Sequence, residues 1–153
     1  MSKSRVAITA GAVFLSAALA VSLFSAQESN SITPEQVLTW GCETTEYQPE
    51  SITITCADGG LYVEKIKWST WTKDGATGVG IFSENLCDPN CAEGQRVEAS
   101  VNLSLTNLTE QNGKYYLRTL DISTPDGKDF AWGRVNGFEW DVMEFAEMMK
   151  SSD

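Results

Sequence analysis

The chain has 153 residues, the length of one domain, and a formal net charge of −10 from 11 basic and 21 acidic residues. Phosphate backbones and anionic lipids are bound through clustered lysine and arginine, so this charge argues against nucleic acid and against an anionic membrane surface as partners. The chain contains no histidine, which excludes Ser-His-Asp and Cys-His hydrolases and removes the commonest metal ligand.

The N-terminus is typical of a secretory signal. Lys3 and Arg5 form a basic start, and residues 6–26 carry no charge and are mostly small or apolar. Ala18-Leu-Ala20 and Ala20-Val-Ser22 have the small residues of a cleavage site, and a weaker site ends at Ala26, so we expect the signal peptide to lie within residues 1–26. Its removal leaves nine basic against 21 acidic residues, a net charge of −12. The alternative is an uncleaved anchor over residues 6–26, which are numerous enough to cross a bilayer.

Behind this segment, residues 27–33 are expected to form a short tether and residues 34–153 a single domain outside the cytoplasm, either secreted or anchored. Membrane contact is expected only through the N-terminal segment if it is uncleaved. Thr33-Pro34-Glu35-Gln36 predicts a short helix, because threonine at the cap, proline at the first position and glutamine three residues after the cap favour a helix start.

Beyond Gly41 the pattern is almost entirely β. Residues 96–108 give the clearest strand, since five apolar residues alternate in register with polar ones. Asn112-Gly113 predicts a hairpin turn, and the helical spacing of Phe138, Val142, Phe145 and Met149 predicts a C-terminal helix over residues 140–150. We therefore expect a mostly β domain, a small antiparallel sandwich or barrel with two disulfides. Further strands are expected over residues 51–56, 61–72, 76–82, 114–122 and 129–135.

Four cysteines in an exported domain favour two disulfides, for which three pairings exist. Cys87 and Cys91 flank Pro89, whose fixed φ favours a turn that brings the two side chains together. We therefore expect the pairs Cys42–Cys56 and Cys87–Cys91. Zinc is a less favoured alternative, because a structural site usually needs a second close pair of ligands. A redox role is also less favoured, since no basic residue adjoins the short bridge.

Five tryptophans in one domain raise the hypothesis of a sugar-stacking platform, although core packing is their commoner use. Trp68 and Trp71 are three apart on a predicted strand, so we expect them on opposite faces, one in the core and one exposed. The candidate binding surface is therefore Trp68 or Trp71 together with the loop residues Asp88, Pro89 and Asn90.

Nothing in the sequence matches a catalytic, cofactor or metal motif. Acidic residues are numerous, but their spacing selects no two that would face each other as glycosidases require. We expect a non-catalytic module without a cofactor that binds a protein or a cell-wall glycan. A secreted protease inhibitor with the Cys87–Cys91 loop as bait and a small hydrolase using a carboxylate pair are the alternatives.

Four motifs follow one another in order along one block of the chain: Ser51-Ile-x-Ile-x-Cys56-Ala-Asp58-Gly59, Ile66-x-Trp68-Ser69-x-Trp71, Ala76-x-Gly78-x-Gly80 and Cys87-x-Pro89-x-Cys91-Ala92-x-Gly94. This block resembles a group of small uncharacterised secreted or cell-envelope proteins of actinomycete-type bacteria. The resemblance covers about a third of the chain and ends before Trp140. It implies export and a disulfide-bonded β fold, and it implies no reaction.

Overall fold

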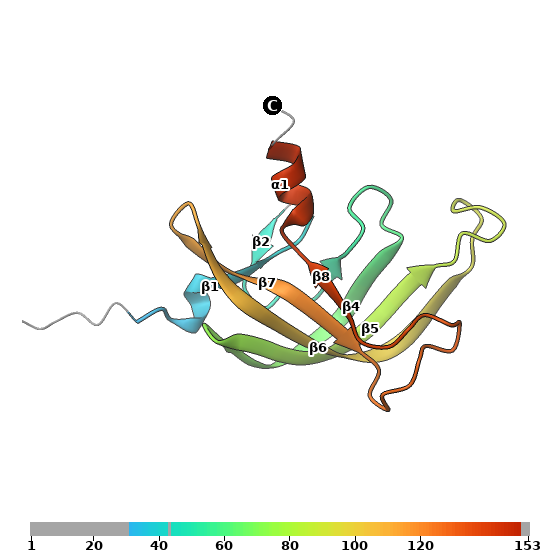
Figure 1. Ribbon diagram of the computed structural model, residues 1–153, viewed down its shortest axis with the longest axis horizontal. Coiled ribbons are helices and arrows are strands. Elements are labelled where there is room, and N and C mark those ends of the chain that lie inside the picture. Colours follow the sequence, from blue (N-terminus) through green and yellow to red (C-terminus); the bar gives the residue numbers. More distant parts are fainter. Residues whose placement is uncertain (1–30, 43, 151–153) are drawn as a thin grey trace, which may run out of the picture. The chain divides into compact units, whose positions relative to one another are not determined.

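The computed structural model describes residues 31–42 and 44–150. The expected signal peptide, residues 1–26, lies outside them, as do residues 27–30 of the expected tether. Within the described part, one sheet of eight strands is accompanied by a short 3-10 helix and a C-terminal α-helix (Figure 1). The elements are η1 Pro34–Gln36, β1 Val37–Trp40, β2 Thr45–Glu46, β3 Ile52–Thr53, β4 Leu61–Thr72, β5 Gly75–Asn85, β6 Arg96–Gln111, β7 Lys114–Ser123, β8 Phe138–Asp141 and α1 Glu144–Lys150.

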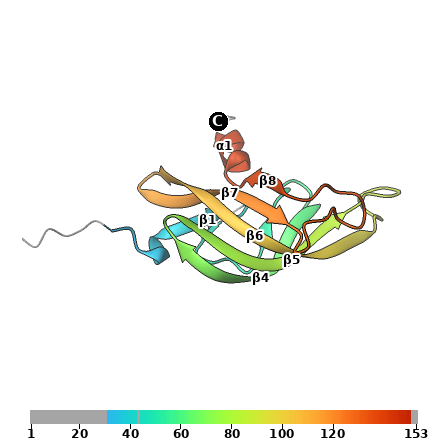
Figure 2. The ribbon, with the colours of Figure 1, turned by 60° about the horizontal axis from the view of Figure 1, so that its bottom comes forward.

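The sheet has the strand order β2-β1-β7-β6-β5-β4-β3, with β8 also paired to β7. All neighbours are antiparallel except β1 and β7, which are parallel. One edge of β7 serves two partners in turn, because β1 pairs with Tyr115 and Tyr116 while β8 pairs with residues 119–122. Figure 2 shows the long strands β4 to β7 curling into a half barrel. The expected mostly β fold is thus confirmed.

Side chains connect the two ends of the curled sheet. The disulfide Cys42–Cys56 links the chain just after β1 to the chain just after β3, with a Cα–Cα distance of 5.3 Å. Trp71 on β4 donates from Nε1 to the carbonyl oxygen of Val37 on β1, at 2.8 Å. We call this junction the seam. It closes the half barrel through a covalent bond and a side-chain hydrogen bond, because the described strands form no ladder there.

The interior is filled from the strands and from the loop that follows β7. On β6, Val101, Leu103 and Leu105 are buried between exposed or half-buried polar neighbours, which confirms the expected apolar face. Phe130 from the loop packs on Phe82 of β5, with ring centroids 5.4 Å apart. The buried core also contains Val37, Ile52, Ile54, Val63, Ile66, Trp71, Ala76, Tyr116, Leu117, Leu120, Ile122, Val142 and Met143.

Strand β4 departs from simple alternation. Its pairing with β5 shifts register between residues 64 and 67 and again between residues 68 and 70. Lys65 in the first irregularity has a φ of 53°. Because a bulge changes which face the following residues point to, Trp68 and Trp71 lie on the same side, with ring centroids 4.8 Å apart and an edge-to-face angle of 82°. The prediction that they point to opposite faces is therefore wrong.

Residues 129–135 are not the expected strand. They form a loop in which the amide of Phe130 donates to the carbonyl of Arg134, and the amide of Asn136 donates to the side chain of Asp129. These local hydrogen bonds use the groups that a strand would offer to a neighbour. Buried or half-buried residues nevertheless alternate with exposed ones along this loop, the inner ones being Phe130, Trp132 and Arg134. This alternation explains why the sequence predicts a strand here.

The two expected helices are present but short. At the N-terminus, Gln36 accepts a hydrogen bond from the backbone amide of Thr33 at 2.8 Å, and the single turn passes directly into β1. The C-terminal helix begins at Glu144 rather than at residue 140, because Trp140 pairs with Leu120 in the sheet. In the described residues, the helices lack the length and apolar character needed to cross a membrane.

Candidate functional site

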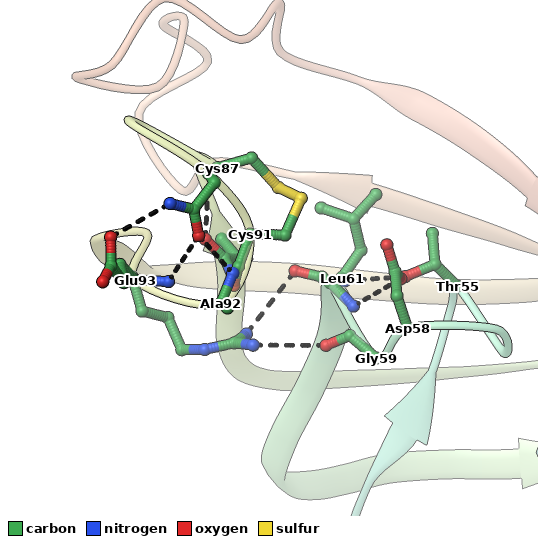
Figure 3. Close-up of a disulfide and its surroundings, with 12 residues drawn as sticks. Thr55, Asp58, Gly59, Leu61, Cys87, Cys91, Ala92 and Glu93 are labelled. Atoms are coloured by element: carbon green, nitrogen blue, oxygen red, sulfur yellow. Dashed lines mark hydrogen bonds between the residues drawn. A yellow bond between two sulfur atoms is a disulfide. The ribbon is translucent and has the colours of Figure 1, made fainter.

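The connection between β5 and β6, residues 86–95, forms a closed loop that we call the disulfide loop (Figure 3). The bond Cys87–Cys91 closes it, with a Cα–Cα distance of 3.9 Å. At its base, the amide of Leu86 donates to the carbonyl of Gln95. Both expected disulfide pairs are therefore confirmed. The exposed residues of the loop include the predicted site residues Asp88, Pro89 and Asn90, together with Cys91, Ala92 and Glu93.

Two asparagines hold the backbone of the disulfide loop. Asn85, at the end of β5, donates from Nδ2 to the carbonyl of Cys91 and accepts from the amide of Cys87, both at 2.9 Å. Asn90 accepts at Oδ1 from the amides of Ala92 and Glu93, both at 3.0 Å. Side chains thus satisfy backbone groups on both sides of the disulfide, so the shape of the loop is fixed by several bonds at once.

Gly94 completes the loop by leaving room for its neighbours. A Cβ atom added there would lie 2.9 Å from the carbonyl oxygen of Asn90 and 2.9 Å from the Cα atom of Cys87, and it would also overlap Oδ1 of Asn85. These contacts are closer than real Cβ atoms make, so a larger residue would push the loop apart. The glycine that ends the Cys-x-Pro-x-Cys-Ala-x-Gly motif therefore has a packing role.

A second turn, residues 55–61, lies beside the disulfide loop in Figure 3, and we call it the Asp58 turn. Arg96, the first residue after the loop, donates to the carbonyl oxygens of Gly59 and Gly60 at 3.3 and 3.5 Å. Its guanidinium also lies 4.8 Å from the ring centroid of Tyr62. One arginine therefore connects the base of the disulfide loop to the neighbouring turn.

Three exposed carboxylates lie on these two turns, and the exposed Arg96 is the basic residue that joins them. The hydrogen bond from the amide of Gly60, 2.8 Å long, lowers the pKa of Asp58, and the Thr55 hydroxyl and Arg96 lower it further. The carboxylate is therefore ionised at neutral pH. Asp88 and Glu93 add two more acidic side chains on the exposed part of the loop. Together they present negative charge to solvent on a backbone of fixed shape.

The two tryptophans of the predicted surface lie elsewhere. Trp71 is only 5 % exposed and holds the seam, and Trp68 is half-buried and donates from Nε1 to the carbonyl of Pro49 at 2.9 Å. Trp68 pairs with Gly78 on β5, and the disulfide loop starts only after Asn85 on the same strand. At about 3.3 Å per residue the two places are roughly 20 Å apart along the strand. The structure does not bring the predicted surface together.

The carboxylates that arginines bind at short distance serve the fold. Arg118 on β7 donates to Asp141 at 2.6 Å and to Glu147 at 2.8 Å, which anchors α1 to the sheet and raises the pKa of the arginine. Glu84 is paired with Arg134 and also accepts from Nε1 of Trp132 at 2.7 Å. Both sets are saturated by cationic or N–H donors, so their arrangement is that of structural ion pairs.

Sequence reasoning identified the cysteines and the exposed tip but missed Asn85 and Arg96. Gly94 was part of a recognised motif, and its role follows only from what surrounds it. Nothing in the sequence pointed to Asn85 or Arg96. Asn85 bonds the ordinary backbone groups of Cys87 and Cys91, and Arg96 bonds backbone carbonyls that are distant in sequence, so neither contact has a sequence motif. In the described ranges, no three histidine, cysteine or acidic residues are placed to hold a metal ion.

Comparisons of the chain with protein-family models, with curated proteins and with solved structures find no match. The two disulfides themselves indicate an oxidising, extracytoplasmic environment. What the molecule does is therefore inferred from the shape, charge and exposure of its own surface.

Proposed function

We propose that this chain is an exported, non-catalytic module that binds a protein partner through its disulfide loop. The observation that carries the proposal is that the disulfide loop exposes residues on a backbone of fixed shape. A disulfide, two asparagines and a closely packed glycine hold that backbone. A loop that is already ordered loses little conformational entropy when it binds. Loops held by a rigid scaffold are frequent binding elements.

The charge of the loop favours a basic partner. Asp88, Glu93 and the neighbouring Asp58 favour a surface that presents lysine or arginine. Because these carboxylates are exposed, salt screens their attraction, and binding is expected to weaken as ionic strength rises. A partner recognised through apolar contacts would show little salt dependence.

Export is part of the same proposal, and the two disulfides support it. The basic start followed by the uncharged residues 6–26 favours secretion with removal of the signal. Mass spectrometry of the protein from the producing organism tests this: a mature N-terminus between residues 21 and 27 is expected. Recovery of the intact chain from the membrane fraction would instead show the anchored form, and recovery of intact chain from the cytoplasm would contradict export.

The resemblance to small secreted or cell-envelope proteins of actinomycete-type bacteria also belongs to the proposal. Two of its motifs have a structural role in this chain. The Cys87-to-Gly94 motif forms one braced loop, and Gly78 and Gly80 of another motif are both packed against β4. The motifs therefore describe features that the fold uses together.

A capture experiment tests the binding role. The mature domain is cross-linked to an envelope fraction of the producing organism, and the Asp88→Lys variant is compared with Asp74→Lys, which makes the same charge change in the β4–β5 turn. We expect a partner that the unmodified domain and Asp74→Lys recover equally, and that Asp88→Lys recovers at least tenfold less. Equal recovery by all three proteins, or recovery of no protein, would show that the disulfide loop is not the binding element.

A secreted protease inhibitor is the second candidate, because the same exposed, disulfide-closed loop would act as bait. Proteases usually bind an extended segment by strand pairing, whereas residues 91–93 form a turn. Undiminished activity of secreted proteases in excess domain would dismiss this candidate. A polysaccharide-binding role on Trp68 and Trp71 and a carboxylate-pair hydrolase have less support, since those side chains serve the core and the structural ion pairs.

A further inference from the structure

A groove of about 460 Å³ lies between the Asp58 turn on one side and β8 and α1 on the other. Trp140, Phe145 and Met148 form the wall on the β8 and α1 side, and Cys56 and Ala57 form the wall on the turn side. Met148 is 53 % exposed, Ala57 is exposed, and the other three side chains are half-buried. This apolar surface is therefore open to a ligand and is not sealed in the core.

Both walls of the groove are held by contacts that the fold already makes. Arg118 on β7 holds α1 through its ion pair with Glu147, at 2.8 Å. On the other side, the disulfide of the seam fixes Cys56, and the hydroxyl of Thr55 accepts a hydrogen bond from the amide of Leu61 at 2.9 Å. A groove that is formed in advance loses little conformational entropy when a ligand enters it.

The groove has a carboxylate on each side. Asp58 belongs to the turn and Glu144 to the first turn of α1, and both side chains are exposed. The described residues that line the groove include no lysine or arginine. A ligand that combines an apolar group with positive charge would match this arrangement, because the apolar group would contact the walls while the charge lies near the carboxylates.

The groove is continuous with the surface of the disulfide loop. Asp58 lines the groove, and Arg96 joins the turn of Asp58 to the base of the loop. Exposed carboxylates orient a partner and speed its approach, but they contribute little affinity. Most of the binding energy at an interface comes from a few side chains that are desolvated in a pocket. A partner that binds the loop needs such a contact, and this groove offers one beside Asp58.

We infer that the groove receives an apolar side chain of the protein partner, and that lysine or arginine flanks this side chain in the partner. The inference rests on the proposed function and specifies the chemistry of the segment that binds. The apolar side chain supplies affinity by leaving water. The flanking basic residues supply orientation, and their attraction to the carboxylates weakens as ionic strength rises.

Nuclear magnetic resonance of the methionine methyl groups in the mature domain tests the inference. The Met148→Leu variant identifies the Met148 signal. The probes are two pentapeptides of four lysines, one with a central leucine and the other with a central serine. We expect the leucine peptide to shift the Met148 signal saturably and to bind at least about fivefold more tightly than the serine peptide. Equal affinity of the two peptides, or a Met148 signal that stays in place, overturns the inference.

A variant of the groove and a matched control assign the contact. Met148→Gln makes this exposed side chain polar and keeps its length and helix preference, so it should fold normally and weaken binding of the leucine peptide at least about fivefold. Val79→Thr is the matched change outside the groove, at a side chain that is 48 % exposed, and it should leave binding unchanged. Equal weakening by both variants would overturn the inference.

The capture experiment separates this inference from the proposed function. We expect Met148→Gln to recover less of the partner than the unmodified domain does, as Asp88→Lys should. The two proposals fail on different results. Capture kept by Asp88→Lys contradicts the role of the disulfide loop, and capture kept by Met148→Gln but lost by Asp88→Lys contradicts the role of the groove.

Discussion

At the scale of single residues, one carboxylate fixes the longest loop of the domain. Glu84 on β5 receives the guanidinium of Arg134 and the indole N–H of Trp132, both from the loop between β7 and β8. The Arg134 hydrogen bonds lower the pKa of Glu84 below its ordinary value of 4.5, Trp132 lowers it further, and burial opposes both. Arg134 also lies 5.2 Å from the ring centroid of Phe138. The ion pair with Glu84 thus holds the loop to β5, and Arg134 also packs on the ring of Phe138.

This ion pair predicts a loss of stability in acid. A carboxyl group whose pKa is lowered in the folded protein contributes its stability above the unfolded pKa, and that contribution disappears as the pH falls through the folded pKa. We expect Glu84→Gln to lower the free energy of unfolding by about 1–3 kcal/mol at neutral pH. Denaturant unfolding from pH 7 to pH 3 should show this difference shrinking below pH 4.5.

Asp126→Asn provides the control for that experiment. Asp126 also has a lowered pKa, caused chiefly by a hydrogen bond from the Lys128 side chain, but it is fully exposed and solvent screens the interaction. The variant should unfold almost like the unmodified protein across the same pH range. An equal effect of both variants would mean that general charge, and not the Glu84 contacts, controls acid stability.

Residue identities alone could not have predicted these contacts. Arg134 and Trp132 belong to a stretch whose alternation indicates a strand, and Glu84 is one of 21 acidic residues. The cysteines were different, because their spacing and the turn-forming Pro89 are enough to favour one pairing over the others. Contacts between residues close in sequence were predictable. The contact between Arg134 and Glu84, which are 50 positions apart, was not.

At the scale of elements, β4 approaches β5 closely because two residues of β5 are glycines, which have no side chain. A Cβ atom added to Gly78 on β5 would lie 2.9 Å from the carbonyl oxygen of Lys67 and 3.0 Å from the Trp68 ring. A Cβ atom added to Gly80 would lie 2.8 Å from a methyl group of Val63. The two bulges in β4 bring its backbone and side chains toward β5 at these points. The glycines are therefore required by the shape of the neighbouring strand.

Replacing Gly78 tests this fit. We expect Gly78→Ala to lower the free energy of unfolding by about 1–3 kcal/mol, because the added methyl group overlaps backbone atoms that cannot move aside easily. Val79→Ala is the matched change one residue later, on the outer face where Val79 is 48 % exposed, and it should cost only about 0.5 kcal/mol. Equal stability of the two variants in urea titrations would contradict the close approach of β4.

For regularly paired strands, the sequence predicts both the extent and the side-chain faces. For the irregularly paired strand β4, it predicts the extent but not the faces. The bounds expected for residues 61–72 are those of β4, and the Asn112-Gly113 turn has the two positive φ angles that such a hairpin needs. Which face each side chain of β4 occupies depends on its bulges, which exist only in the pairing of β4 with β5. Residues 138–141 join the sheet because β7 offers them an edge, a fact absent from their own sequence.

At the scale of the whole molecule, the two disulfides have different tasks and should differ in their effect on stability. Breaking Cys42–Cys56 removes a cross-link over 14 residues and opens the seam, with a chain-entropy cost of about 3 kcal/mol. Breaking Cys87–Cys91 removes a cross-link over four residues, with a cost of about 2 kcal/mol, and leaves the sheet closed.

Paired cysteine-to-serine variants measure this difference. Cys42→Ser with Cys56→Ser should unfold at clearly lower denaturant concentration than Cys87→Ser with Cys91→Ser. The second pair of changes should instead reduce capture of a partner by the disulfide loop while the core stays folded. The reverse order of stability would show that the half barrel does not depend on its covalent seam.

The overall class of the fold was predictable because strand periodicity, turns and cysteines all indicated it. The closure of the sheet was not, since it depends on Trp71 meeting Val37 across a gap of 34 positions. The candidate site was predictable in part: the exposed loop tip was expected, but its separation from the tryptophans follows from the length of β5.

The position of β1 has a consequence for the time course of assembly. This strand is the first that the structure describes, yet its parallel partner β7 is the last of the long strands, and Thr39 bonds across 78 positions to Leu117. A chain that emerges from its N-terminus can form Cys42–Cys56 early, because both cysteines have already appeared. It cannot seat β1 until Tyr115 and Tyr116 arrive. Completion of the half barrel is therefore a late event, and a chain that stops before β7 leaves β1 without its parallel partner and β6 with an open edge.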